Sequence, residues 1–193
     1  MDSSLSVTLP SKLLARCKAY GERVISDYAF GMNTASRSVS THRADVDSQV
    51  QILGRAAECA VSLWCGLDIE QLNWTRGCDG GFDVLIERIY RADVKATSER
   101  GRLLIWPIGK RHIFESKQFD LLILVRRSGA DEFLIRGWSS KVGFKRDHEV
   151  ADGLPGITDG TWYMHERDLN NPYLLRDGGC DTIFDDDRAE LAA

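Results

Sequence analysis

The sequence has no cysteine pair of the CxxC type and no long apolar run. Its five cysteines are an odd number and include no CxxC pair, which argues against a disulfide framework and a zinc ribbon and fits a reducing cytoplasm. No segment is apolar and long enough for a signal peptide or a transmembrane helix. We therefore expect a soluble, cytoplasmic protein with no membrane partner.

The chain also lacks an excess of positive charge. Its formal net charge is -4, with a pI near 5.6, so any contact with nucleic acid must come from a local basic surface. The four histidines show no metal-ligand spacing and no HExxH motif, which argues against zinc. These absences leave carboxylates and lysines as the residues with chemistry to examine.

The length of 193 residues and the hydrophobic content of 43% predict one compact domain. We divide the chain into an N-terminal helix and polar loop (1–44), a core (45–175) and an acidic C-terminal tail (176–193). The run of aspartates in the tail is typical of a solvated segment rather than a site.

Apolar periodicity predicts two long helices, from Ser11 to about Phe30 and from about Asp47 to Cys65. Shorter helices are expected within 110–118 and 139–146. Five strands are expected, at 81–86, 89–97, 102–106, 121–125 and 132–138. This order predicts an α/β fold, a mixed sheet of about five strands flanked by helices.

The first two of these strands carry an acid and a base side by side. Asp93 and Lys95 are two positions apart and therefore share one face of the sheet. A two-residue turn before them would send Asp83 and Asp93 to opposite faces, whereas a three-residue turn at 87–89 would set them opposite each other. We predict the three-residue turn, or a bulge with the same effect, and an apolar opposite face that packs against a helix.

Taken singly, these residues have ordinary explanations. An Asp-x-Lys tripeptide is usually a surface ion pair, and Glu58 alone is an ordinary helix glutamate. Two carboxylates from adjoining strands beside an ammonium group are, however, the groups that bind a divalent metal and activate water. The combination, with small residues around Glu58, favours a metal site.

The set resembles the pattern of the PD-(D/E)XK nuclease superfamily, in which a helix glutamate, a strand aspartate and an Asp/Glu-x-Lys strand precede a Gln or Lys. In chain order the matching residues are Glu58, Asp83, Asp93, Val94, Lys95 and Gln118 or Lys117. The resemblance covers about residues 45–140, and its Gly137-Trp138 is similar to that of phage- and prophage-type members. No proline precedes Asp83, and Asp93 stands where glutamate is commoner.

This resemblance implies a restriction-endonuclease-like fold and hydrolysis of nucleic-acid phosphodiesters, with DNA as the expected substrate. It implies Mg²⁺ as the cofactor, with Mn²⁺ as a substitute, held by Glu58, Asp83, Asp93 and the Val94 carbonyl. Lys95 would orient the attacking water, and Gln118 would position Lys95 or the substrate. Cutting of both DNA strands would fit a homodimer.

Six basic residues are candidates for phosphate contacts, with scattered surface charge as the alternative. They are Lys110, Arg111, Lys117, Lys141, Lys145 and Arg146. Two other functions remain open: a catalytically silent nuclease-fold module that binds DNA or assembles a nucleoprotein complex, and a structural protein in which the acids and lysine form a surface ion-pair group.

Overall fold

The computed structural model describes residues 5–32, 41–72, 74, 82–98, 103–152 and 160–176. The helices and strands are β1 (Leu5–Thr8), α1 (Ser11–Met32), α2 (Thr41–Trp64), η2 (Ile69–Gln71), β2 (Val84–Ile86), β3 (Tyr90–Thr97), β4 (Leu103–Pro107), η3 (Ile108–Lys110), α3 (Arg111–Ser116), β5 (Leu121–Arg127), β6 (Glu132–Ser140), α4 (Lys141–Asp147), β7 (Glu149–Ala151), β8 (Thr161–His165), η4 (Glu166–Asp168) and α5 (Tyr173–Arg176).

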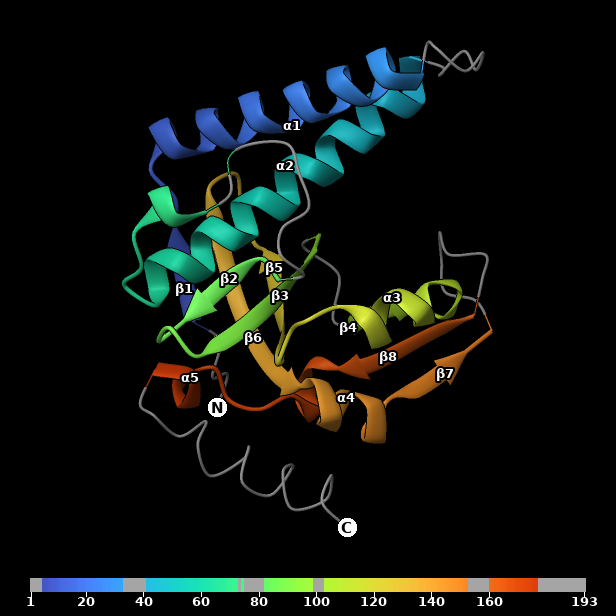
Figure 1. Ribbon diagram of the computed structural model, residues 1–193. Helices are drawn as coiled ribbons and strands as arrows, with labels where there is room; N and C mark the ends of the chain where they lie inside the picture. Colours follow the sequence, from blue (N-terminus) through green and yellow to red (C-terminus); the bar gives the residue numbers. More distant parts are fainter. Residues whose placement is uncertain are drawn as a thin grey trace.

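A five-stranded sheet with strand order β1-β6-β5-β3-β2 forms the centre of the fold (Figure 1). Strands β3 and β5 run parallel, and the other neighbours in this sheet are antiparallel. Helices α1 and α2 lie side by side over one face of the sheet. The predicted mixed α/β architecture with a sheet of five strands is therefore confirmed.

The membership of this sheet differs from the prediction. The strand expected at 102–106 is β4, which lies in a second sheet with strand order β4-β8-β7. The fifth place in the main sheet is taken by β1, which pairs with β6 and was not predicted. The neighbour of β3 in the main sheet is β5, and β4 does not take that place. Leu104 and Trp106 of β4 pack with Trp162 of β8 instead.

Both long helices end close to their predicted limits, but only α1 begins where it was predicted to begin. Helix α1 starts at Ser11, as predicted, and α2 starts at Thr41, six residues before the predicted start at Asp47. The end of the predicted polar loop is thus helical, whereas residues 33–40 lie outside the described part of the chain. The predicted acidic tail lies there too, apart from Arg176.

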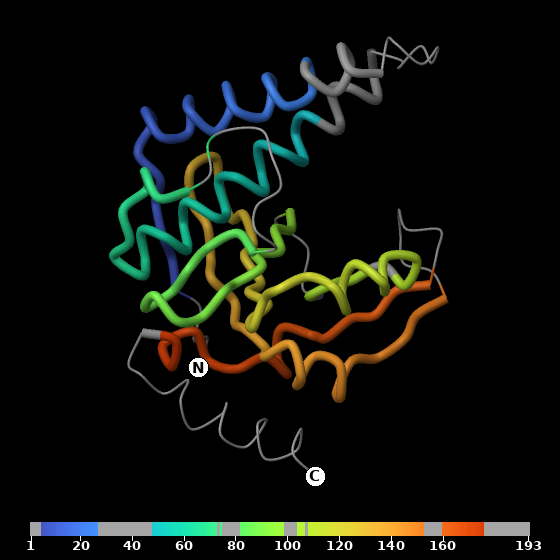
Figure 2. The backbone as a smooth tube through the Cα atoms, in the orientation of Figure 1, coloured from blue at the N-terminus to red at the C-terminus, as the bar shows by residue number. Residues whose placement is uncertain are grey.

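The main sheet separates two apolar cores. One lies between the sheet and α2, and it contains the alternate hairpin residues that were predicted to face a helix. These are Val84, Ile86, Tyr90, Ala92 and Val94. The other core joins Leu122 and Leu124 of β5 to aromatic residues of β4, α3, α4 and β8. Figure 2 shows the path of the chain from the N-terminal helices, through the central strands, to β7 and β8.

The hairpin between β2 and β3 has the predicted register. Ile86 pairs with Tyr90 and Val84 with Ala92, so the turn contains the three residues 87–89 and the register continues to place Asp83 opposite Asp93. Two turn residues that are not glycine, Glu87 and Arg88, have φ angles of 51° and 61°. The prediction of a three-residue turn is confirmed, at the expense of left-handed backbone at two side-chain-bearing positions.

Gly137 allows residues 169–170 to approach β6 closely. Its φ is 154°, and a Cβ atom there would lie 2.7 Å from Leu169 Cβ and 2.8 Å from the Asn170 carbonyl oxygen. A register shift in the β5–β6 ladder occurs beside it. The buried Trp138 exchanges backbone hydrogen bonds with Asn170. The Gly-Trp pair therefore has a structural explanation here.

The left-handed backbone at Arg88 predicts that glycine is better tolerated than alanine at this position. Replacing Arg88 with glycine should give a more stable protein than replacing it with alanine, by roughly 1 kcal/mol, because alanine keeps the steric penalty of a positive φ. Urea unfolding of the two variants measures this difference. An alanine variant as stable as the glycine variant would contradict the left-handed conformation at this position.

Candidate active site

Two aspartates from adjoining strands form the centre of the candidate site. Asp83 precedes β2 and its carboxylate Oδ2 accepts a hydrogen bond from the Val94 N–H at 2.7 Å. Asp93 lies within β3, opposite Leu122 of β5, and its side chain is only 1% exposed. The hairpin register and this cross-strand hydrogen bond fix the two carboxylates at one place on the sheet.

Two lysines neutralise the Asp93 carboxylate. The Lys117 ammonium Nζ donates a hydrogen bond to Oδ1 at 2.5 Å, and the Lys95 ammonium forms an ion pair with Oδ2. Lys95 Nζ also lies 4.4 Å from the centre of the Trp106 ring, an attractive cation–π arrangement. A buried carboxylate needs such partners, because an isolated buried charge is strongly unfavourable.

The surroundings of Asp83 favour its protonated form. Burial, followed by the negative charges of Asp93 and Glu58, raises the pKa of Asp83 well above its ordinary value of 3.8. The Lys117 charge and the Val94 N–H act in the opposite direction but do not cancel the rise. The contribution of Glu58 to this shift places the helix glutamate within electrostatic reach of Asp83.

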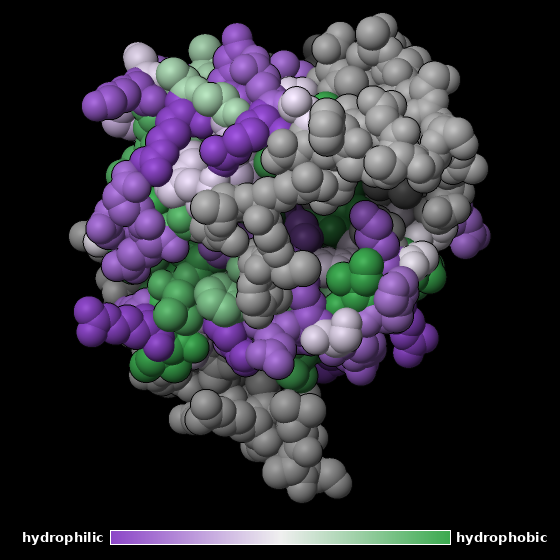
Figure 3. All heavy atoms as spheres, turned by 45° about the horizontal axis from the view of Figure 1, so that its top comes forward, coloured by the Kyte–Doolittle hydropathy of each residue, from purple (hydrophilic) through white to green (hydrophobic). Residues whose placement is uncertain are grey.

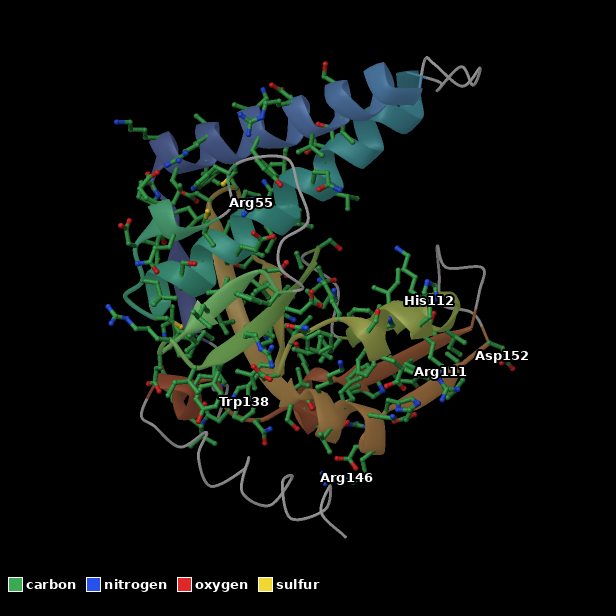
Figure 4. All side chains as sticks on the ribbon, viewed as in Figure 1. Arg55, Arg111, His112, Trp138, Arg146 and Asp152 are labelled. Atoms are coloured by element: carbon green, nitrogen blue, oxygen red, sulfur yellow. The ribbon has the colours of Figure 1, made fainter. Side chains whose placement is uncertain are left out.

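Glu58 is held by a residue that the sequence analysis missed. Arg55 forms an ion pair with the Glu58 carboxylate at 2.5 Å, with both side chains largely buried. The Arg55 guanidinium faces α1, where its carbon Cζ lies 4.2 Å from the centre of the Tyr20 ring (Figure 4). The spacing of Arg55 and Glu58, three residues apart on a predicted helix, was a signal that could have identified the pair.

Of the two residues proposed to follow the Asp-x-Lys strand, Lys117 is the one that contacts Asp93. Lys117 comes directly after α3, where its N–H caps the helix by donating to the Ile113 carbonyl. The neighbouring Gln118 is exposed, and its side-chain oxygen accepts a hydrogen bond from Arg91 at 3.4 Å. The structure therefore brings Lys117 into the carboxylate group and directs Gln118 to Arg91.

Lys141, a predicted phosphate contact, stabilises the end of α3. Its ammonium group donates hydrogen bonds to the carbonyls of Lys117, at 2.8 Å, and Glu115, at 3.3 Å. It also lies 4.7 Å from the centre of the Phe119 ring. Burial lowers the pKa of this ammonium group. These contacts make Lys141 part of the support beneath Lys117.

Two further predicted phosphate contacts pair with acids at the surface. Lys145 lies 3.1 Å from the Glu115 carboxylate, and Arg146 lies 2.8 Å from that of Asp147. All four side chains are exposed, so each pair is weak. A phosphate group can compete for these cations, although the neighbouring acids reduce the local positive potential.

Lys110 and Arg111 are exposed at the start of α3. The Arg111 guanidinium carbon lies 5.6 Å from the centre of the Trp162 ring. Figure 4 shows Arg111 and His112 on the α3 side of the molecule and Arg146 below them, all away from Arg55. These basic side chains lie on the part of the fold that also carries Lys117.

The described surface is largely polar on the face drawn in Figure 3, where hydrophobic side chains form separate patches. None of the described helices has both the length and the apolar content that crossing a lipid bilayer requires. The face in view gives no sign of a single extended apolar surface among the residues that are coloured there.

The donor chemistry of the site fits a hard divalent cation. Asp83, Asp93 and the Val94 carbonyl offer the oxygen ligands that Mg²⁺ prefers, and Asp93 Oδ2, which is buried, has the Lys95 ammonium group as its ion-pair partner and accepts no further hydrogen bond. With the side chains in their present positions, however, no three Asp, Glu, His or Cys residues of the described chain are grouped so that they could hold a metal ion. The Lys95 and Lys117 ammonium groups lie against the Asp93 carboxylate, where they take the place of a metal ion.

The pKa of Asp83 predicts a pH-dependent stability. Because the folded chain holds this proton more tightly than the unfolded chain does, the free energy of unfolding should fall as pH rises from about 4 towards the raised pKa. Asp83→Asn removes the titrating group and keeps an acceptor for the Val94 N–H. Its stability in EDTA should exceed that of the native protein by about 1 kcal/mol or more at pH 8 and by little at pH 4.

Urea unfolding at the two pH values, with exposed Asp131→Asn as the control, measures this effect. A variant that is less stable than the native protein at pH 8 would show that Asp83 is ionised without penalty.

Comparison with known proteins adds no relative from which a role could be transferred. No protein-family model, curated protein or solved structure matches this chain. The residues and their geometry are therefore the basis for proposing a function.

Proposed function

We propose that this protein is a metal-dependent nuclease of the PD-(D/E)XK type, with a restriction-endonuclease-like fold, which hydrolyses phosphodiester bonds in nucleic acid. DNA is the proposed substrate and Mg²⁺, or Mn²⁺ in its place, the proposed cofactor. The observation that carries the proposal is the pairing of Asp83 and Asp93 across the hairpin, with Lys95 against Asp93. The raised pKa of Asp83 adds to it, because perturbed carboxylates cluster at functional sites.

Each residue has a distinct role in the proposed reaction. Asp83, Asp93 and the Val94 carbonyl would hold the cation, with Glu58 as a direct or water-mediated ligand. When bound, the divalent ion supplies positive charge beside the phosphate and lowers the pKa of water. Lys95 is fixed by β3 and by the Trp106 ring. Its ammonium group would orient the attacking water, or it would stabilise the negative charge that develops on the 3′-oxygen as the bond to this oxygen breaks.

Arg55 has a positioning role in this scheme. Its ion pair with Glu58 and its contact with Tyr20 hold the glutamate in one orientation on α2. The proposed DNA-binding side is the one that carries Lys110 and Arg111, because these cations are exposed and phosphate contacts orient a nucleic acid without reading its sequence.

One observation favours a second candidate, a catalytically silent module that binds DNA or assembles a nucleoprotein complex. Both carboxylate oxygens of Asp93 face ammonium groups. In a silent protein these ion pairs would be permanent, and the acids would serve the fold alone. Such a protein would bind DNA without metal and would be unaffected in function by neutral replacement of Asp93.

The proposed function is tested by cleavage of plasmid and single-stranded DNA with Mg²⁺, with Mn²⁺ and with EDTA. The native protein should cut with either metal and not with EDTA. Asp93→Asn should reduce the rate at least about a hundredfold, since even the outer partners of metal ligands contribute ten- to a hundredfold. Asp131→Asn, which changes an exposed carboxylate in the same way, should cut at the native rate.

Equal cutting by the native protein and by Asp93→Asn would contradict the catalytic role of Asp93. Metal-independent DNA binding by both, with no cutting by either, would instead support the silent module.

A further inference from the structure

We propose that Lys117 is the resident cation of Asp93, and that a divalent ion binds only by displacing its ammonium group from Oδ1. This inference rests on the proposed function, since it concerns the same site, and it adds a competition between a side chain and the metal. It predicts that the free protein binds its metal more weakly than its carboxylates alone would allow.

Both carboxylate oxygens of Asp93 already face an ammonium group. Lys117 Nζ lies 2.5 Å from Oδ1, and Lys95 forms an ion pair with Oδ2. Like charges repel strongly when the surroundings are shielded from water, and Asp93 is almost completely buried. A divalent ion held by Asp93 would therefore compete with an ammonium group.

Lys117, rather than Lys95, is the lysine that can withdraw. Lys95 belongs to β3, two residues from Asp93, and its ammonium group contacts the Trp106 ring as well. Lys117 extends from the chain after α3 and reaches Asp93 across 24 positions of sequence. Its N–H donates to the end of α3, and a rotation of its long side chain would leave the β3 strand in place.

The charges at Asp93 explain why a competitor is present. One buried carboxylate faces two ammonium groups, Lys95 and Lys117, so this group of three is cationic before any metal arrives. In the absence of metal, Lys117 supplies a counter-charge to the buried Asp93 carboxylate. The same contact that stabilises the metal-free fold thus lowers the affinity for the metal.

The test is Mn²⁺ binding to the full-length protein without DNA, followed by electron paramagnetic resonance of free Mn²⁺. Lys117→Met should bind Mn²⁺ about tenfold more tightly than the native protein, an effect of the size expected when one strong ion pair is removed. Lys117→Arg, which keeps the positive charge, should stay within about twofold of the native affinity. Lys18→Met removes a charge from the surface of α1, where Lys18 pairs with Glu22, and should leave the affinity unchanged.

The outcomes separate this inference from the proposed function. Native-like affinity in Lys117→Met, with a native circular dichroism spectrum, would overturn the competition and leave the nuclease proposal standing. If Lys117→Met does not fold, Lys117→Gln provides the same comparison with a polar side chain. No Mn²⁺ binding by any variant would overturn the metal-dependent function, and the inference with it.

Discussion

The register of the β2–β3 hairpin is the constraint on which the candidate site depends. Side chains alternate between the faces of a sheet, so a turn shorter by one residue would move Asp83 to the face occupied by the α2 core. The chain adopts left-handed backbone at Glu87 and Arg88 to make the three-residue turn. The same register buries Val84 and Ala92 against α2, and packing therefore reinforces the arrangement that brings the acids together.

Burial of the acidic side chains is energetically unfavourable, and neighbouring cations offset this cost. Asp93 is almost completely buried, and Lys95 and Lys117 supply its counter-charges from β3 and from the end of α3. Glu58 has its own partner in Arg55, whereas Asp83 is left with a raised pKa. Carboxylates with perturbed pKa values cluster at functional sites, so the raised pKa of Asp83 supports the proposed role of this group.

Local rules were sufficient where sequence neighbours determine the structure. Alternation placed Asp93 and Lys95 on one face, and helical periodicity located the start of α1 at Ser11. The three-residue turn at 87–89 was predicted because only a turn with an odd number of residues places Asp83 and Asp93 on the same face of the sheet.

Contacts between distant segments could not be predicted in this way. Nothing within β4 distinguishes a strand of the main sheet from a strand of the second sheet, because the choice depends on the pairing of β5 with β3 and on the aromatic residues of α3 and β8. The choice between Lys117 and Gln118 depends likewise on where α3 ends in space. The direction of a side chain that follows a helix depends on the tertiary structure. Lys117 therefore contacts Asp93, whereas the adjacent Gln118 contacts Arg91.

The position of the metal is tested most directly by a crystal structure of the protein grown with Mn²⁺, with data collected at a wavelength that gives an anomalous signal from manganese. We expect one anomalous peak between the carboxylates of Asp83 and Asp93, with the Lys117 ammonium group turned away from Oδ1. A hairpin with these two aspartates on opposite faces, or a peak distant from both, would contradict this expectation.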